Sequence, residues 1–153
     1  MTLRRSILIL ALALPAAAAA QTPAPYRPGL GDLMTMTVQP RHLKLGVAGQ
    51  EKNWPYAVYE GHELEEAFER IAKLVPKWRE FDIPQLLAAT VKQPLDDLEA
   101  AAKANDGRRF DAAYRQLTDA CNACHKSANV GVIAIKAPDA QAFPDQDFRA
   151  TKP

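Results

Sequence analysis

The only two cysteines of the chain stand three residues apart and a histidine follows at once, in the segment Cys121-Asn122-Ala123-Cys124-His125. In a CxxCH pattern the two thiols add to the vinyl groups of a haem, and the adjacent imidazole binds the iron. Residues three and four apart share one face of a helix, so both sulfurs and His125 would lie together. The motif predicts one haem c, covalently bound to Cys121 and Cys124, with His125 as the proximal iron ligand.

Three other uses of a CxxC pair match the sequence less well. A structural zinc site needs four ligands, and this segment supplies three, two of them adjacent. A thioredoxin-like redox pair would stand near a βαβ pattern, and the sequence shows no alternation of strands and helices. A disulfide between Cys121 and Cys124 would close too short a loop to stabilise the fold much. Disulfide or redox chemistry is the main alternative to haem attachment.

The N-terminus has the order of a secretory signal peptide. Arg4 and Arg5 precede an apolar run over residues 6–15, and the alanines of residues 16–20 offer an A-x-A cleavage site before Gln21. The apolar run is short for a membrane span and prolines follow it, so stable membrane insertion is not expected. We expect residues 1–20 to be removed on export to the periplasm, the kind of oxidising compartment in which bacterial c-type haem is attached.

The charge balance narrows the choice of partners. Lys and Arg number 19 and Asp and Glu 18, and the leader contains two of the arginines, so the mature chain is nearly neutral. A nucleic-acid-binding protein would favour a clear positive excess, and no nucleic-acid partner is expected. No constellation of acid, base and nucleophile indicates an enzyme.

The remaining chain has the length of one all-α domain, in which a Pro-rich segment over residues 21–29 precedes a helical region over residues 30–127. The spacing of apolar residues predicts main helices over residues 30–47, 53–75, 94–105 and 108–127, with a shorter helix after Pro84. Pro40 should kink or break the first helix near Val38. Gly46 and Gly49 should mark its end.

An exported all-α chain with four main helices and CxxCH at the end of the fourth resembles the class II cytochromes c, the cytochrome c′ type. Class I cytochromes c carry the motif near the N-terminus instead. The resemblance covers residues 30–127, and it implies a four-helix bundle with the haem near one end. Residues 128–153 form a C-terminal extension beyond the usual end of that family. Its apolar run over residues 130–135 is expected to pack on the bundle near the haem edge.

The ligand on the second side of the iron decides between two functions. Methionine ligation raises the potential and suits electron transfer, whereas an open site binds small gases. Met36 is the preferred sixth ligand, because it shares an apolar stripe with Leu33, Leu43 and Val47. The alternatives are Met34, which points about 160° away from Met36 in a regular helix, and His42. In a regular helix His42 lies opposite the stripe, where a surface position is more common.

The sequence therefore predicts a periplasmic monohaem c-type cytochrome that acts as an electron carrier for a redox partner protein. The second hypothesis is a five-coordinate protein of the cytochrome c′ kind that binds or senses NO or CO. Both hypotheses leave a homodimer open.

Overall fold

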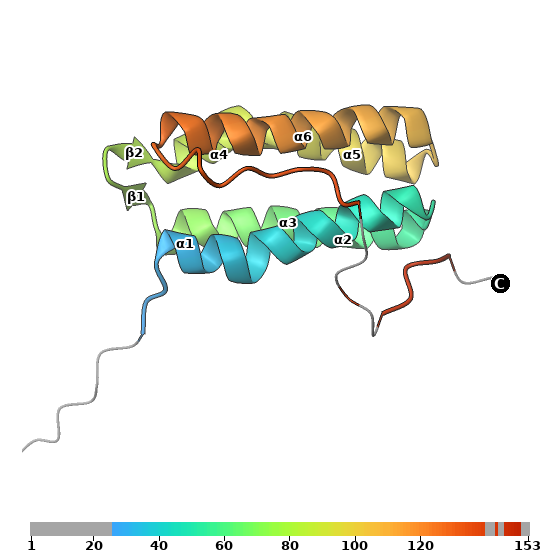
Figure 1. Cartoon of the computed structure of the whole chain (residues 1–153), viewed down its shortest axis with the longest axis horizontal. Helices are drawn as coiled ribbons and strands as arrows, with labels where there is room; N and C mark the ends of the chain where they lie inside the picture. The colour runs from blue at the N-terminus through green and yellow to red at the C-terminus, as the bar shows by residue number, and fades with distance from the viewer. Residues whose placement is uncertain (1–25, 140–142, 144–145, 151–153) are drawn as a thin grey trace, which may run out of the picture.

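The computed structural model describes residues 26–139, 143 and 146–150. The predicted signal peptide over residues 1–20 and the Pro-rich residues 21–25 lie outside this part of the chain. Within it the fold is predominantly helical (Figure 1), and the predicted all-α class is confirmed. No helix in the described ranges is long and apolar enough to span a membrane.

The elements follow in the order α1 (Leu30–Leu33), the π-helix η1 (Met34–Val38), α2 (Gln39–Gln50), α3 (Trp54–Leu74), β1 (Lys77–Trp78), β2 (Phe81–Asp82), α4 (Ile83–Thr90), α5 (Lys92–Lys103) and α6 (Gly107–Ser127). Helices α3, α4 and α6 each begin at a side chain that accepts a hydrogen bond from a backbone N–H in the first turn; these caps are Asn53, Asp82 and Asp106. Such caps satisfy N–H groups that have no partner within the helix. The caps agree with the predicted starts of the helices at residues 53 and 108 to within two residues.

The first helix does not break at Pro40; it continues through a π turn. The N–H of Gln39 donates to the carbonyl of Met34, five residues back. Because Pro40 has no N–H, a regular α-helical ladder would lack a donor here, and the wider turn accommodates the proline. One extra residue in a turn rotates the following residues by roughly 100°. The predicted stripe is therefore wrong at Met36, which is 71% exposed, although Leu33 and Val47 are buried as predicted. The surface position predicted for His42 is also wrong, because His42 is buried.

Helix α2 ends at Gln50, so the predicted end of the first helix at Gly46 and Gly49 is confirmed to within about one turn, and both glycines are buried. A Cβ atom at Gly46 would stand 2.5 Å from the Tyr114 hydroxyl, and one at Gly49 would overlap the ring of Phe110. Both aromatic residues belong to α6. Because the two glycines have no side chain, the aromatic side chains of α6 can contact the backbone of α2.

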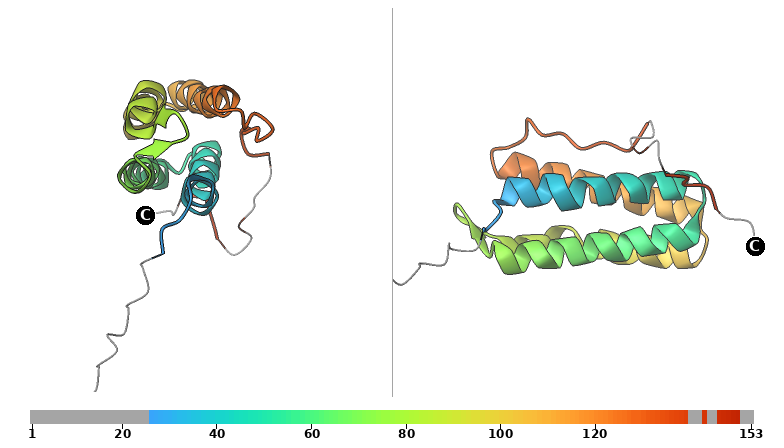
Figure 2. Two further views of the ribbon diagram at one scale, coloured as in Figure 1. Left: turned by 90° about the vertical axis from the view of Figure 1, so that its left-hand side faces the viewer. Right: turned by 90° about the horizontal axis from the view of Figure 1, so that it is seen from below.

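The long helices lie side by side in the end-on view (Figure 2). Helix α3 packs on α2 and α5, and α5 packs on α6, while α2 and α6 touch each other less. The inner face of α3 includes Leu64, Phe68 and Ile71, which are buried. After α6 the chain turns back and runs along the seam between α6 and α2 (Figure 1). This course brings the C-terminal extension next to the helices on both sides of the seam.

A small hairpin between α3 and α4 was not predicted. Strands β1 and β2 pair in antiparallel register, with Trp78 opposite Phe81. The hairpin reaches the end of α6, where Nη1 of Arg79 donates to the carbonyl oxygen of Ala128 over 3.0 Å. Strands of two residues carry no periodic pattern, so apolar spacing could not indicate them.

Candidate functional site

The CxxCH residues occupy the last two turns of α6. The inner face of this helix carries Phe110, Tyr114 and Leu117 into the core, and Cys121 stands one turn beyond Leu117. Cys121 and Cys124 are half-buried, and both have free thiols. The C-terminal end of α6 lies at the end of the molecule where α1 begins (Figure 1). The structure therefore brings the two sulfurs to one side of α6, as the spacing predicts.

The side chain of His125 is held by the chain that returns from the end of α6. Its Nδ1 atom lies 2.7 Å from the carbonyl oxygen of Ile133. A carbonyl can only accept, so Nδ1 carries the hydrogen of this bond. In the neutral imidazole the lone pair is then on Nε2. A backbone carbonyl on one ring nitrogen is the usual way in which proteins orient a metal-binding histidine.

The thiols do not have the properties of a redox pair. Burial, with a further contribution from Cys124, raises the pKa of the Cys121 thiol to about 11. Burial also raises the pKa of Cys124. Redox-active CxxC pairs need the opposite, a thiol whose pKa is lowered so that the thiolate forms near neutral pH. The raised values disfavour the redox alternative.

A zinc site finds no support in the geometry either. Among the residues that the structure describes, no group of three or more His, Cys, Asp or Glu side chains could hold a metal ion. Haem attachment does not require the three side chains to bind one metal ion. The two sulfurs bond to carbon atoms of the haem, and only the imidazole of this motif binds the iron. The residues present fit these requirements, because α6 carries two free thiols on one side and an oriented imidazole.

The three candidate sixth ligands have different surroundings. Met36 is 71% exposed, so the expectation that it faces the interior is wrong. Met34 is partly buried and packs against the hydrophobic core. His42 is buried, with Nε2 3.0 Å from the Thr118 hydroxyl and Nδ1 3.0 Å from that of Tyr114. His42 could bind iron only if it lost one of these hydrogen bonds.

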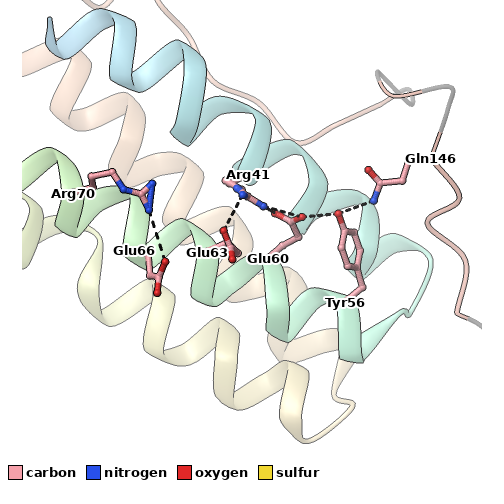
Figure 3. Close-up of polar contacts among 7 residues, drawn as sticks. All are labelled: Arg41, Tyr56, Glu60, Glu63, Glu66, Arg70 and Gln146. Atoms are coloured by element: carbon pink, nitrogen blue, oxygen red, sulfur yellow. Dashed lines mark hydrogen bonds and ion pairs between the residues drawn. The ribbon is translucent and has the colours of Figure 1, made fainter. Parts of the chain in front are cut away.

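A buried carboxylate links the extension to α2 and α3 (Figure 3). Glu60 is 1% exposed; it accepts from the Tyr56 hydroxyl over 2.5 Å and pairs with Nη1 of Arg41 at 3.2 Å. Gln146 of the extension donates to the Tyr56 hydroxyl over 2.7 Å. Burial and the hydrogen bond to Glu60 raise the pKa of Tyr56 to about 12. Sequence analysis did not single out Glu60, because one buried Glu in an amphipathic helix has no pattern of its own.

An open cleft of about 710 Å³ lies at the opposite end of α6 from the motif; its lining includes Lys52, Trp54, Arg108 and Asp111. Asp111 precedes Cys121 by almost three helical turns, or about 15 Å along α6. The cleft is therefore separate from the candidate haem site.

In comparisons with known proteins, no family model, no curated protein and no solved structure matches this chain.

Proposed function

We propose that this chain is a periplasmic monohaem c-type cytochrome that carries electrons, with its haem held in a four-helix bundle. The proposal rests on the hydrogen bonding of the His125 imidazole. Its Nδ1–H donates to Ile133, and its Nε2 lone pair is left for a metal. This imidazole follows directly on two free thiols, one helical turn apart. The resemblance of residues 30–127 to the class II cytochromes c supports the four-helix bundle and the covalently bound haem.

In this proposal Cys121 and Cys124 hold the haem through thioether bonds, and Nε2 of His125 binds the iron. The bound haem supplies reversible exchange of one electron between the ferric and ferrous states. The chain orients the imidazole through Ile133 and covers one side of the site with the C-terminal extension. Met34 is the proposed sixth ligand, since a methionine must reach the interior to bind iron.

The second candidate function is the binding of a small gas at five-coordinate iron. It is favoured by the outward position of Met36 and by the two hydrogen-bonded ring nitrogens of His42. If Met34 does not reach the iron either, the second side stays open.

Mass spectrometry of the mature protein tests haem attachment. We expect the mass of the polypeptide plus one haem, retained after extraction with acidified acetone. A Cys121→Ala, Cys124→Ala variant should release all its haem under the same treatment. A wild-type mass without haem, with Cys121 and Cys124 joined in a disulfide, would overturn the proposal.

Absorption spectra of the ferrous holoprotein with and without CO separate the two functions. An electron carrier with a methionine ligand should resist CO, whereas a five-coordinate protein should bind it at once.

A further inference from the structure

The chain beyond α6 forms a return segment, residues 130–135, that is fixed to the helix at both ends. At its start the chain reverses direction at Asn129, which adopts a positive φ of 57°. The N–H of Val130 then donates to the carbonyl of His125 over 2.8 Å. At its end, the Asn122 side chain donates to the carbonyl of Ile135 over 2.8 Å and accepts from the N–H of Ile135 over 2.7 Å.

The backbone, and not the apolar side chains, attaches the return segment to α6. Val132 is 97% exposed and Ile133 is 53% exposed. The side chains of these two residues therefore do not provide the expected packing of the run on the bundle. A primary amide offers one donor and one acceptor side by side, so Asn122 binds Ile135 in the way that a neighbouring strand would. The next hydrogen bond from a helix to the extension comes three residues later, where Gln50 donates to Pro138.

Asn122 and His125 lie on the same side of α6, three residues apart. Ile133, whose carbonyl accepts from Nδ1 of His125, stands between the two anchored ends of the return segment. The position of this carbonyl therefore depends on the anchor at Asn122. Among residues with side chains of this size, Asp could accept from the Ile135 N–H but could not donate to the Ile135 carbonyl.

We propose that Asn122 is a positioning residue for the axial imidazole, an inference that rests on the proposed function. By holding Ile135, it keeps the Ile133 carbonyl on Nδ1 of His125. A hydrogen bond at Nδ1 makes Nε2 a stronger donor, and a stronger donor favours ferric over ferrous iron. The C-terminal extension thus lowers the reduction potential of the haem.

The test compares the mature holoprotein with the variants Asn122→Ala and Ile135→Pro. The first removes both hydrogen bonds of the amide, and the second removes the N–H that donates to it. Gln116→Ala is the matched control, since Gln116 is an exposed amide on the same helix. Each protein is measured by mass, by redox titration and by hydrogen exchange of the peptide that covers residues 130–136.

Both variants should raise the reduction potential, and exchange in the return segment should become about tenfold faster or more, because each variant loses hydrogen bonding between Asn122 and Ile135. The Gln116→Ala control should change neither quantity. An unchanged potential in haem-loaded Asn122→Ala and Ile135→Pro would overturn the inference and leave the proposed function standing. A wild-type mass without haem would overturn the proposed function itself, and the role of Asn122 towards iron with it.

Discussion

The hydroxyl of Tyr114 lies 3.0 Å from Nδ1 of His42 and donates to the carbonyl oxygen of the same residue over 2.8 Å. The Tyr114 hydroxyl of α6 thus contacts two polar atoms of a single residue in α2. Thr118, one turn further along α6, lies 3.0 Å from the other ring nitrogen of His42. These contacts join α2 and α6 deep in a seam where the two helices otherwise touch little.

Removing this hydroxyl should destabilise the fold. In Tyr114→Phe the ring stays, but buried atoms of His42 lose a partner, and we expect the free energy of unfolding to fall by about 1–3 kcal/mol. Chemical denaturation measures this change. Tyr26→Phe is the control, because Tyr26 is 81% exposed and should change stability by less than about 0.5 kcal/mol. Equal stability of the two variants would show that the Tyr114 hydroxyl contributes nothing.

His42 should make the fold sensitive to acid. Burial lowers its pKa to about 4, from 6.5 in the unfolded chain. Between these values the unfolded state binds more protons than the folded state, so stability is full above pH 6.5 and falls as the pH drops towards 4. The total loss from this residue is roughly 3 kcal/mol. Unfolding free energies from pH 8 to 4 should therefore show a smaller slope in His42→Gln than in the wild type.

The helices could be predicted from local sequence, but the register of the first one could not. Apolar spacing and caps indicate α3 and α6 because nothing interrupts their regular turns. In the first helix Pro40 is accommodated by a π turn, and the extra residue turns Met36 outward and His42 inward. Sequence can show that a proline disturbs the ladder; whether the chain breaks, kinks or widens depends on the packing of α2 against α3 and α6.

The candidate site, too, could be predicted only in part from the sequence. Cys121, Cys124 and His125 form a contiguous motif, so their common side of α6 follows from helical spacing alone. The carbonyl that orients His125 comes from Ile133, and the amide that anchors the segment is Asn122, which the motif treats as a variable position. Hydrogen bonds between a helix and an irregular segment leave no periodic signal in the sequence. Glu60 and its partners escaped prediction for the same reason.

The close approach of α2 to α6 should make Gly49 intolerant of a methyl group. A Cβ atom there would overlap the ring of Phe110, and overpacking of this kind costs about 1–3 kcal/mol. Gly61 of α3 is the matched control, because a Cβ atom there meets nothing within 4 Å. Gly61→Ala should stabilise the helix by up to about 1 kcal/mol. Thermal unfolding of the two variants should give shifts of opposite sign; a rise in both midpoints would mean that Phe110 moves aside without cost.

The end of the extension should contribute to stability through Phe148. Its side chain is fully buried, its ring meets Tyr56 edge-on at 5.9 Å, and its carbonyl accepts from Nδ2 of Asn53. Phe148→Ala should lower the free energy of unfolding by about 3 kcal/mol, as measured by denaturant titration. Arg149→Ala changes an exposed side chain and should have little effect; if both variants unfold alike, the extension is not docked in solution.

The two methionines of η1 should respond differently to substitution if the protein is an electron carrier. Met34 packs against the core, and Met36 is mostly exposed, so only Met34 is placed to reach an iron in the interior. A thioether on ferric haem gives a weak charge-transfer band at the red edge of the visible spectrum, which histidine ligation lacks. Met34→Ala should abolish this band and let the ferrous protein bind CO, and Met36→Ala should change neither property. The reverse result would make Met36 the ligand after a rotation of η1 on haem binding. A wild-type protein that lacks the band and binds CO would instead establish the open, gas-binding site.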